Sequence, residues 1–159
     1  MPVGKTISPS PDIKSAVVDT RPTPAAYGRS LTGLGFNLIV RDLDRAVAFV
    51  VQVLTADVVF RSETFAAVTL SDVPFMLHAD QTYRNNPLKG SLVAAEARGV
   101  GVELRAYEVD PDAAEARARA GGWVVLAGTI DKPHGLRECM ILDDDGYVWI
   151  PSSRLQDQP

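Results

Sequence analysis

Three polar side chains that could bind or activate a small molecule recur at alternate positions of one segment, VGVELRAYEV. They are Glu103, Arg105 and Tyr107. Successive side chains of a strand point to opposite faces, so these three share one face and the apolar residues between them share the other. An arginine fork can bind a carboxylate or enolate through two hydrogen bonds, and Glu103 could act as an acid or a base. The competing interpretation is a solvated sheet face whose ion pair contributes little.

Two histidines and one tyrosine are further candidates. His78 ends the segment PFMLHA and could be an acid, a base or an orienting donor, or could simply hydrogen-bond a neighbouring loop. His134 lies in the turn KPHG, where turn geometry explains the proline and glycine but not the histidine. Tyr83 combines contact area with a polar tip and could reach a ligand. For Arg137 and Glu138 we expect structural ion pairs.

Composition and charge exclude several classes of partner. The chain has 159 residues, of which 46% are hydrophobic, which is enough for one compact domain or two small units packed together. A net charge of -4 and a pI of about 5.1 give no indication of nucleic acid or an anionic membrane as the partner. No segment approaches the ~20 apolar residues of a membrane helix. The single cysteine, Cys139, has apolar neighbours and is expected to be an inert buried thiol in the reducing cytoplasm.

The N-terminal segment 1–32 is expected to form an arm outside the folded domain. Within 1–30, the density of prolines argues against a continuous helix or a central strand, so we expect an arm that lies over the surface or is partly disordered. The segment has no apolar run of signal-peptide length. The prolines concerned are Pro2, Pro9, Pro11, Pro22 and Pro24.

The rest of the chain contains an internal repeat. A strand at 34–40 leads into a helix at 41–54 that starts on an aspartate, and three strand-like runs follow. The same order recurs with a strand at 100–109, a helix at 110–122 and three more strands. Aligning the helix starts superposes Asp42 on Asp110, an offset of 68 residues. The long connection 80–98 is expected to be a lid, a binding loop or a passive crossover, with one short helix around 92–98.

Two tandem strand-helix-three-strand units resemble the vicinal oxygen chelate superfamily, which includes glyoxalases, extradiol dioxygenases, fosfomycin-modifying enzymes and bleomycin-binding resistance proteins. The resemblance covers about 33–152, and its most specific part is GLRECMILDDDGYVWIP, which is similar to the family ending G-x-R-x-F…D-P-D-G. Asp144 stands where that ending has proline. A hairpin can still close there, so we expect the DDDG segment to be structural.

The resemblance implies an α+β fold, in which tandem βαβββ modules form a curved mixed sheet around a cleft with the helices outside. The first module would span 33–80, the connector 81–98 and the second module 99–152, followed by a tail at 153–159. It also implies a homodimer. In this arrangement Asn37, Tyr107 and Arg105 would face the cleft, with His134 near its mouth.

Metal-dependent members of that superfamily hold a divalent ion with side chains from the first and last strand of each unit. The matching positions here are Gly35, Glu103, Ile150, and either Leu77 or His78. Glycine and isoleucine offer no ligand, and two remaining ligands rarely hold a catalytic metal tightly. We therefore expect no metal and no cofactor.

Two classes of function remain after these exclusions. The first is a metal-independent small-molecule binding protein of the glyoxalase/bleomycin-resistance type, which holds a polar or aromatic metabolite against Asn37, Tyr83, Arg105, Tyr107 and His134. The alternative is a divergent lyase, isomerase or dioxygenase-like enzyme that uses His78 and Glu103. A scaffold whose cleft has closed is a third possibility. If the alternation of 102–107 is correct, Arg105→Ala should weaken binding at nearly constant stability, and Leu104→Ala should do the reverse.

Overall fold

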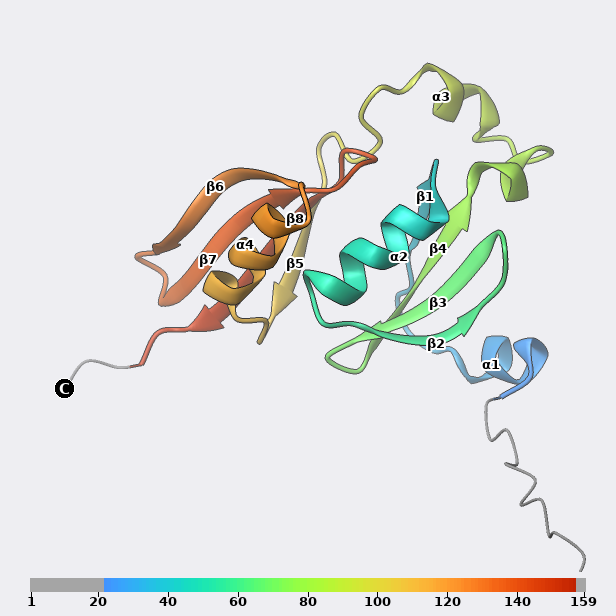
Figure 1. Cartoon of the computed structure of the whole chain (residues 1–159). Helices are drawn as coiled ribbons and strands as arrows, with labels where there is room; N and C mark the ends of the chain where they lie inside the picture. The colour runs from blue at the N-terminus through green and yellow to red at the C-terminus, as the bar shows by residue number, and fades with distance from the viewer. Residues whose placement is uncertain (1–21, 157–159) are drawn as a thin grey trace, which may run out of the picture.

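The computed structural model describes residues 22–156, which form two similar units lying side by side (Figure 1). The first unit consists of β1 (Asn37–Val40), α2 (Leu43–Gln52), β2 (Asp57–Arg61), β3 (Phe65–Leu70) and β4 (Val73–Ala79). The second consists of β5 (Glu103–Tyr107), α4 (Pro111–Ala120), β6 (Val124–Asp131), β7 (Leu136–Leu142) and β8 (Val148–Arg154). The predicted α+β class and the repeated order of strand, helix and three strands are confirmed.

Each unit has its own four-stranded mixed sheet. The strand orders are β1-β4-β3-β2 and β5-β8-β7-β6, so the first strand of each unit lies at an edge and pairs in parallel with the fourth. The sequence predicted one curved sheet around a cleft. Across residues 22–156 the two sheets remain separate, because β1 and β5 each pair with a strand of their own unit only.

The two helices begin at equivalent aspartates. The Asp42 side chain accepts a hydrogen bond from the backbone N–H of Arg45 at 3.0 Å, and the Asp110 side chain accepts one from Asp112 at 3.0 Å. Each cap satisfies an N–H group that has no partner inside its helix. The offset of 68 residues therefore relates two real helix starts.

The core lies between the helices and the sheets. Helix α2 packs on β3 and β4, and α4 packs on β6, β7 and β8. The ring of Phe49 on α2 lies 5.4 Å from that of Trp123 and 6.0 Å from that of Trp149, so apolar packing joins the two units. The face of each sheet turned away from α2 and α4 is called its inner face below.

The short helix α1 (Pro24–Ser30) was not expected from the sequence. The side chain of Thr23 caps it by accepting a hydrogen bond from Ala26, and Pro24 occupies the first turn, where its missing N–H costs nothing. The high proline content therefore misled the prediction at 24–30. The rest of the predicted arm, 1–21, and the last three residues of the predicted tail, 157–159, lie outside the described residues.

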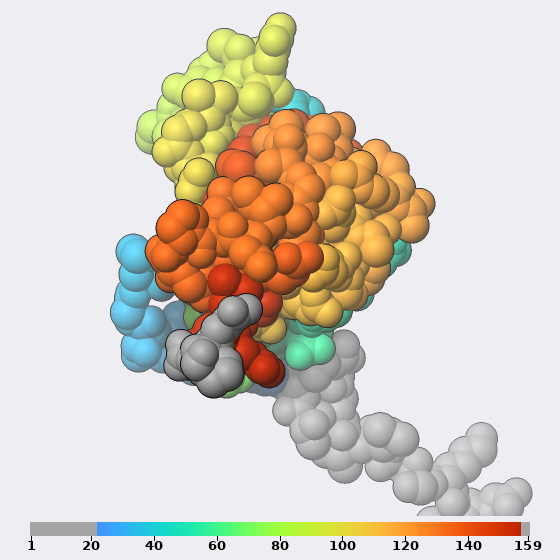
Figure 2. Space-filling model, turned by 90° about the vertical axis from the view of Figure 1, so that its left-hand side faces the viewer, coloured from blue at the N-terminus to red at the C-terminus, as the bar shows by residue number. Residues whose placement is uncertain are grey.

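The connector between the units also differs from its prediction. It begins with a 3-10 turn (Asp80–Tyr83), and its helix α3 spans Lys89–Ala94 rather than 92–98. Figure 2 shows this segment projecting beyond the second unit. Among residues 22–156, no helix is long and apolar enough to cross a membrane.

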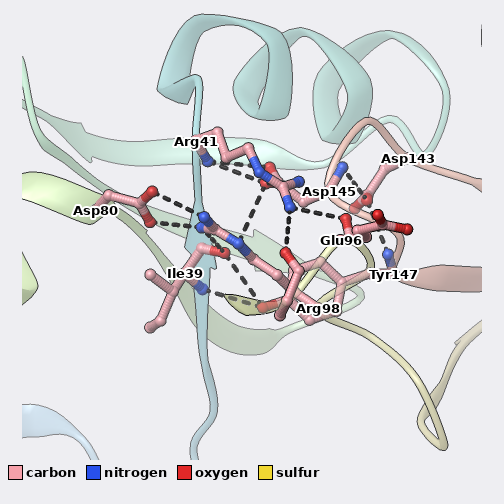
Figure 3. Close-up of polar contacts among 9 residues, drawn as sticks. Ile39, Arg41, Asp80, Glu96, Arg98, Asp143, Asp145 and Tyr147 are labelled. Atoms are coloured by element: carbon pink, nitrogen blue, oxygen red, sulfur yellow. Dashed lines mark hydrogen bonds and ion pairs between the residues drawn. The ribbon is translucent and has the colours of Figure 1, made fainter. Parts of the chain in front are cut away.

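The DDDG segment, residues 143–146, joins the two units (Figure 3). The Asp145 carboxylate accepts a hydrogen bond from the Arg41 backbone at 3.0 Å, and the Tyr147 hydroxyl bonds both backbone groups of Ile39, at 3.2 and 3.3 Å. Arg98 donates to Asp80 at 2.7 Å and to the Ile39 carbonyl at 3.2 Å. Burial raises the pKa of Asp145. Through Asp145, the DDDG segment of the second unit is hydrogen-bonded to the first unit. This agrees with the structural role that the sequence predicted for the segment.

Candidate functional site

A hollow of about 450 Å³ lies between the two units along the free edge of β5. Its walls are largely apolar, and its rim carries the polar residues Glu103, Arg105 and Tyr107 of that strand. We call this space the seam hollow. Its apolar lining comes from Phe36, Leu70, Val73, Phe75, Leu104, Ala106 and Trp149. The size and the apolar walls are typical of a site for a small organic molecule.

The free edge of β5 brings backbone polar groups to the seam hollow. Ser71, in the turn between β3 and β4, donates a hydrogen bond to the carbonyl of Tyr107 at 3.3 Å. This carbonyl therefore points away from β8 and across the free edge. Because alternate residues of a parallel strand direct both backbone groups to the same side, the peptide groups of Glu103 and Arg105 face that edge too.

The inner face of the second unit carries a buried carboxylate, Glu138 on β7, which is 6% exposed. Arg105 hydrogen-bonds it from β5. The Nζ atom of Lys132 lies 3.6 Å from one of its oxygens, and Nε2 of His134 lies 3.5 Å from the other. We call these four residues, together with Ser152 on β8, the Glu138 cluster. Arg105 thus belongs both to the cluster and to the rim of the hollow.

Strand β5 separates polar from apolar side chains as expected. Ala106 is 2% exposed and belongs to the core, and Leu104 is partly buried against it. Val102, which was expected on the apolar face, lies just before β5 begins and is half exposed. The Tyr107 ring lies 6.0 Å from the Arg105 guanidinium, and Glu103 is an exposed side chain 3.4 Å from the same group. Leu104 also lines the seam hollow, so it is not a purely structural residue.

The remaining candidates lie in or next to the first unit. His78 stacks edge-on against Phe65 at 4.8 Å and Tyr83 at 5.6 Å, and its Nδ1 lies 3.4 Å from the Thr82 hydroxyl. Burial lowers the pKa of His78, which keeps the ring neutral near pH 7. Asn37 is exposed at the start of β1. The structure thus groups His78 with Tyr83, and it groups Arg105, Tyr107 and His134 around Glu138.

Helix α1 covers part of the inner face of the first unit. Tyr27 and Leu31 face Phe65 and Met76 across a small apolar space of about 160 Å³. Figure 2 shows α1 on the side of the molecule opposite α4, as a position on the inner side requires. The first unit is therefore partly closed by α1, and within residues 22–156 no helix takes the equivalent place on the second unit.

The positions matching metal ligands in the superfamily hold unsuitable residues. Gly35 precedes β1 and has no side chain, and Ile150 is an apolar residue of β8. Ile150 pairs with Arg105 across the parallel ladder, and Met76 pairs with Asn37 in the same way. Arg105 and Asn37 are equivalent under the 68-residue offset.

The first-unit counterpart of Ile150 is therefore Met76, and the sequence-based choice of Leu77 or His78 was wrong. A thioether suits soft metals such as Cu(I), not the hard oxygen-loving ions. Within the part of the chain that the structure describes, no three His, Cys, Asp or Glu side chains converge as metal ligands would. The residues present do not fit the superfamily's metal centre.

Sequence reasoning gave Glu138 a structural ion pair but no place in the site, and it missed Lys132 and Ser152. The segment LRECMIL did contain the information that places Glu138. Cys139 and Ile141 are buried on the helix side of β7, and residues next to each other in a strand point to opposite faces, so Glu138 lies on the inner face. Cys139 is a free thiol, and burial raises its pKa to about 11. It is inert, as the sequence suggested.

Two units of this topology, each with its first strand at the edge of a four-stranded mixed sheet, define a protein of the vicinal oxygen chelate fold. The family model for the glyoxalase/bleomycin resistance protein/dioxygenase superfamily matches residues 34–150. The chain therefore belongs to that superfamily. Among curated proteins, no sequence matches this chain significantly.

Solved structures share the fold at low sequence identity. A glyoxalase-related enzyme from Fulvimarina pelagi is 19% identical with a TM-score of 0.62, over 78% of this chain and 89% of that one. A glyoxalase/bleomycin resistance protein/dioxygenase family enzyme from Burkholderia phytofirmans is 20% identical with a TM-score of 0.63, over 76% and 97%. The fosfomycin resistance protein FosX from Mesorhizobium loti is 16% identical with a TM-score of 0.53, over 77% and 92%.

Proposed function

We propose that this chain binds a small organic molecule in the seam hollow without the help of a divalent metal. The observation that carries the proposal is the position of Arg105, at the rim of an apolar hollow and in contact with the buried Glu138. The apolar walls suit a ring or chain, and the guanidinium suits an anionic group. A polar or aromatic metabolite that carries a carboxylate or enolate fits both.

The other polar candidate residues would make additional contacts with the ligand. Tyr107 and His134 lie near Arg105 and would contact a ligand that extends from the hollow toward solvent. Asn37 and Tyr83 would contact only a ligand long enough to reach the first unit. Membership in a superfamily whose description includes a bleomycin resistance protein supports binding of a small molecule.

The enzymatic alternative uses His78 and Glu103. His78 packs with Phe65 and Tyr83 in the first unit, whereas Glu103 contacts Arg105 in the second. A general acid and a general base must each lie within hydrogen-bonding reach of the same bound substrate. The different surroundings of these two side chains favour the binding function.

The test is to identify what the purified protein carries. We expect mass spectrometry of small molecules released by denaturation to find a ligand with a ring and an anionic group. Elemental analysis should find less than stoichiometric zinc, iron, manganese or nickel, and chelator should leave the affinity for the released ligand unchanged. A full equivalent of one of these metals, together with loss of binding after chelation, would overturn the proposal.

The proposal includes a homodimer in the cytoplasm. Support for the dimer comes from edge strand β6, where Val124, Leu126 and Ile130 are 55%, 51% and 50% exposed. An apolar edge strand of this kind is suited to pairing with a second copy. A free buried thiol, Cys139, is compatible with a reducing compartment.

A further inference from the structure

Glu138 is surrounded unevenly by positive charge. Arg105 hydrogen-bonds its carboxylate directly, whereas Lys132 and His134 are 3.6 and 3.5 Å away, beyond the usual hydrogen-bonding distance. The only other charged side chain at the Arg105 guanidinium, among residues 22–156, is the exposed Glu103. Glu138 thus has one tight partner and two further cationic or ionisable partners within reach.

The pair of Arg105 and Glu138 covers a buried hydroxyl. Strand β8 lies between β5 and β7, and Ser152 stands opposite Glu138 on one side and Tyr107 on the other. Arg105 must therefore cross over β8 to reach Glu138. Beneath this crossing Ser152 is 1% exposed and Ile150 2%.

The hydroxyl of Ser152 has no hydrogen-bond partner within residues 22–156. A buried polar group without a partner costs stability, so an unsatisfied hydroxyl beside a charged pair needs a reason. A ligand that separates Arg105 from Glu138 would expose Ser152 and could accept its hydrogen bond. The loosely held Lys132 and His134 would then remain as partners for Glu138.

We propose that Glu138 is an internal counter-ion that a ligand carboxylate displaces from Arg105, so that the ligand is held by the Arg105 fork and the Ser152 hydroxyl while Glu138 stays with Lys132 and His134. This proposal rests on the proposed function and narrows its ligand to a carboxylate. Lys132 is a second cation beside the buried Glu138 carboxylate. This makes the exchange of carboxylates at Arg105 electrostatically reasonable, because neither carboxylate is left without a positive partner.

If a ligand carboxylate replaces Glu138 at Arg105, then removing the charge of Glu138 should strengthen ligand binding. Glu138→Gln keeps the size of the side chain but removes its charge, so carboxylate affinity should rise by about tenfold, the equivalent of one charged hydrogen bond. Ser152→Ala removes a ligand donor and should lower the same affinity by about fivefold. Because the Ser152 hydroxyl has no hydrogen-bond partner among residues 22–156, its removal should not lower the melting temperature.

The experiment uses Nile red, a neutral dye, as a fluorescent reporter of the seam hollow in the full chain. Naphthoate and its neutral amide are then compared as competitors in the native protein, Glu138→Gln, Ser152→Ala and the distant control Glu63→Gln. We expect naphthoate to compete better than the amide, Glu138→Gln to increase that preference, Ser152→Ala to reduce it, and the control to match the native protein.

The outcomes distinguish a failure of the proposed function from a failure of the carboxylate exchange at Arg105. If neither the dye nor either competitor binds the native protein, both the proposed function and the exchange are wrong. If the dye binds but naphthoate and its amide compete equally, or both cluster variants leave their ratio unchanged, the exchange is wrong and the proposed function stands. Should Glu138→Gln fail to fold, Ser152→Ala decides alone, since unchanged naphthoate affinity in that variant overturns the exchange.

Discussion

Arg105 contributes both to ligand binding and to stability, and substitutions can separate the two contributions. It offers a fork to an anionic ligand, and it compensates the charge of Glu138, which is 6% exposed. Arg105→Ala should weaken binding of a carboxylate ligand by about 1.5–3 kcal/mol and also lower stability, because a buried carboxylate loses its nearest partner. The sequence alone suggested nearly constant stability for this variant. The buried position of Glu138 changes that expectation.

Arg105→Lys separates these effects. Lysine keeps the positive charge but makes a point contact instead of two parallel hydrogen bonds. We expect Arg105→Lys to lose most of the ligand affinity lost by Arg105→Ala, while its melting temperature falls less. Calorimetric titration and thermal unfolding measure the two quantities, with the exposed Arg154→Ala as the control. Equal stability losses in both Arg105 variants would argue against charge compensation of Glu138.

His78 should make stability depend on pH. Burial lowers its pKa, so the folded protein holds fewer protons on this ring than the unfolded chain does. The stability from the neutral ring is present above the unfolded pKa of about 6.5 and is lost as the pH falls through the lower folded value. Between about pH 7.5 and about pH 5.5, the melting temperature should fall more for the native protein than for His78→Gln. Parallel curves would contradict this, because the two proteins differ only at residue 78.

Residue alternation predicted part of the site. It correctly predicted that Ala106 lies in the core, because the face of a strand that packs beneath a helix must be apolar. It did not predict that Arg105 reaches Glu138, since that contact crosses a strand and depends on the register of β5, β8 and β7. The same reasoning treated Leu104 as a core residue, but it also lines the hollow. Ile141, at 0% exposure, is the better position for a change that affects stability alone.

At the scale of elements, the helix starts were predictable and the strand registers were not. Asp42 and Asp110 act within their own first turns, so their effect can be recognised from neighbouring residues. The pairing of Met76 with Asn37 depends on hydrogen bonds between distant segments, so counting from the turn placed the equivalent of Ile150 one or two residues too late. Helix α1 was missed although its start at Thr23 and Pro24 is also local, because the high proline content was taken to argue against a helix there.

The turn between β7 and β8 has little tolerance for a side chain at Gly146. Its φ is +87°, and an added Cβ would lie 2.8 Å from the Cβ and 2.9 Å from the Cα of Ala97. Gly146→Ala should lower the free energy of unfolding by at least about 1–2 kcal/mol, the cost of the left-handed backbone alone. The control is Gly35→Ala, where an added Cβ meets no atom within 4 Å. Urea denaturation should separate the two variants, and equal midpoints would contradict the role of Gly146 in joining the units.

At the scale of the whole molecule, edge strand β6 should carry the contact between two copies. Ile130→Lys places a charge in its exposed apolar row and should convert a homodimer to a monomer without unfolding it. Light scattering after gel filtration measures the mass, with Val93→Lys on the exposed helix α3 as the control. A native protein that is already monomeric at working concentration would exclude the dimer, and a dimeric Ile130→Lys would place its contact elsewhere.

Helix α1 makes the two halves of a repeated molecule unequal. The units have the same topology, and each offers an inner face, yet Tyr27 and Leu31 face Phe65 and Met76 on the first unit only. A molecule built from two equal halves would otherwise have two comparable places for a ligand. We expect saturation at one equivalent per chain, and a second, weaker equivalent should become measurable only when α1 is removed.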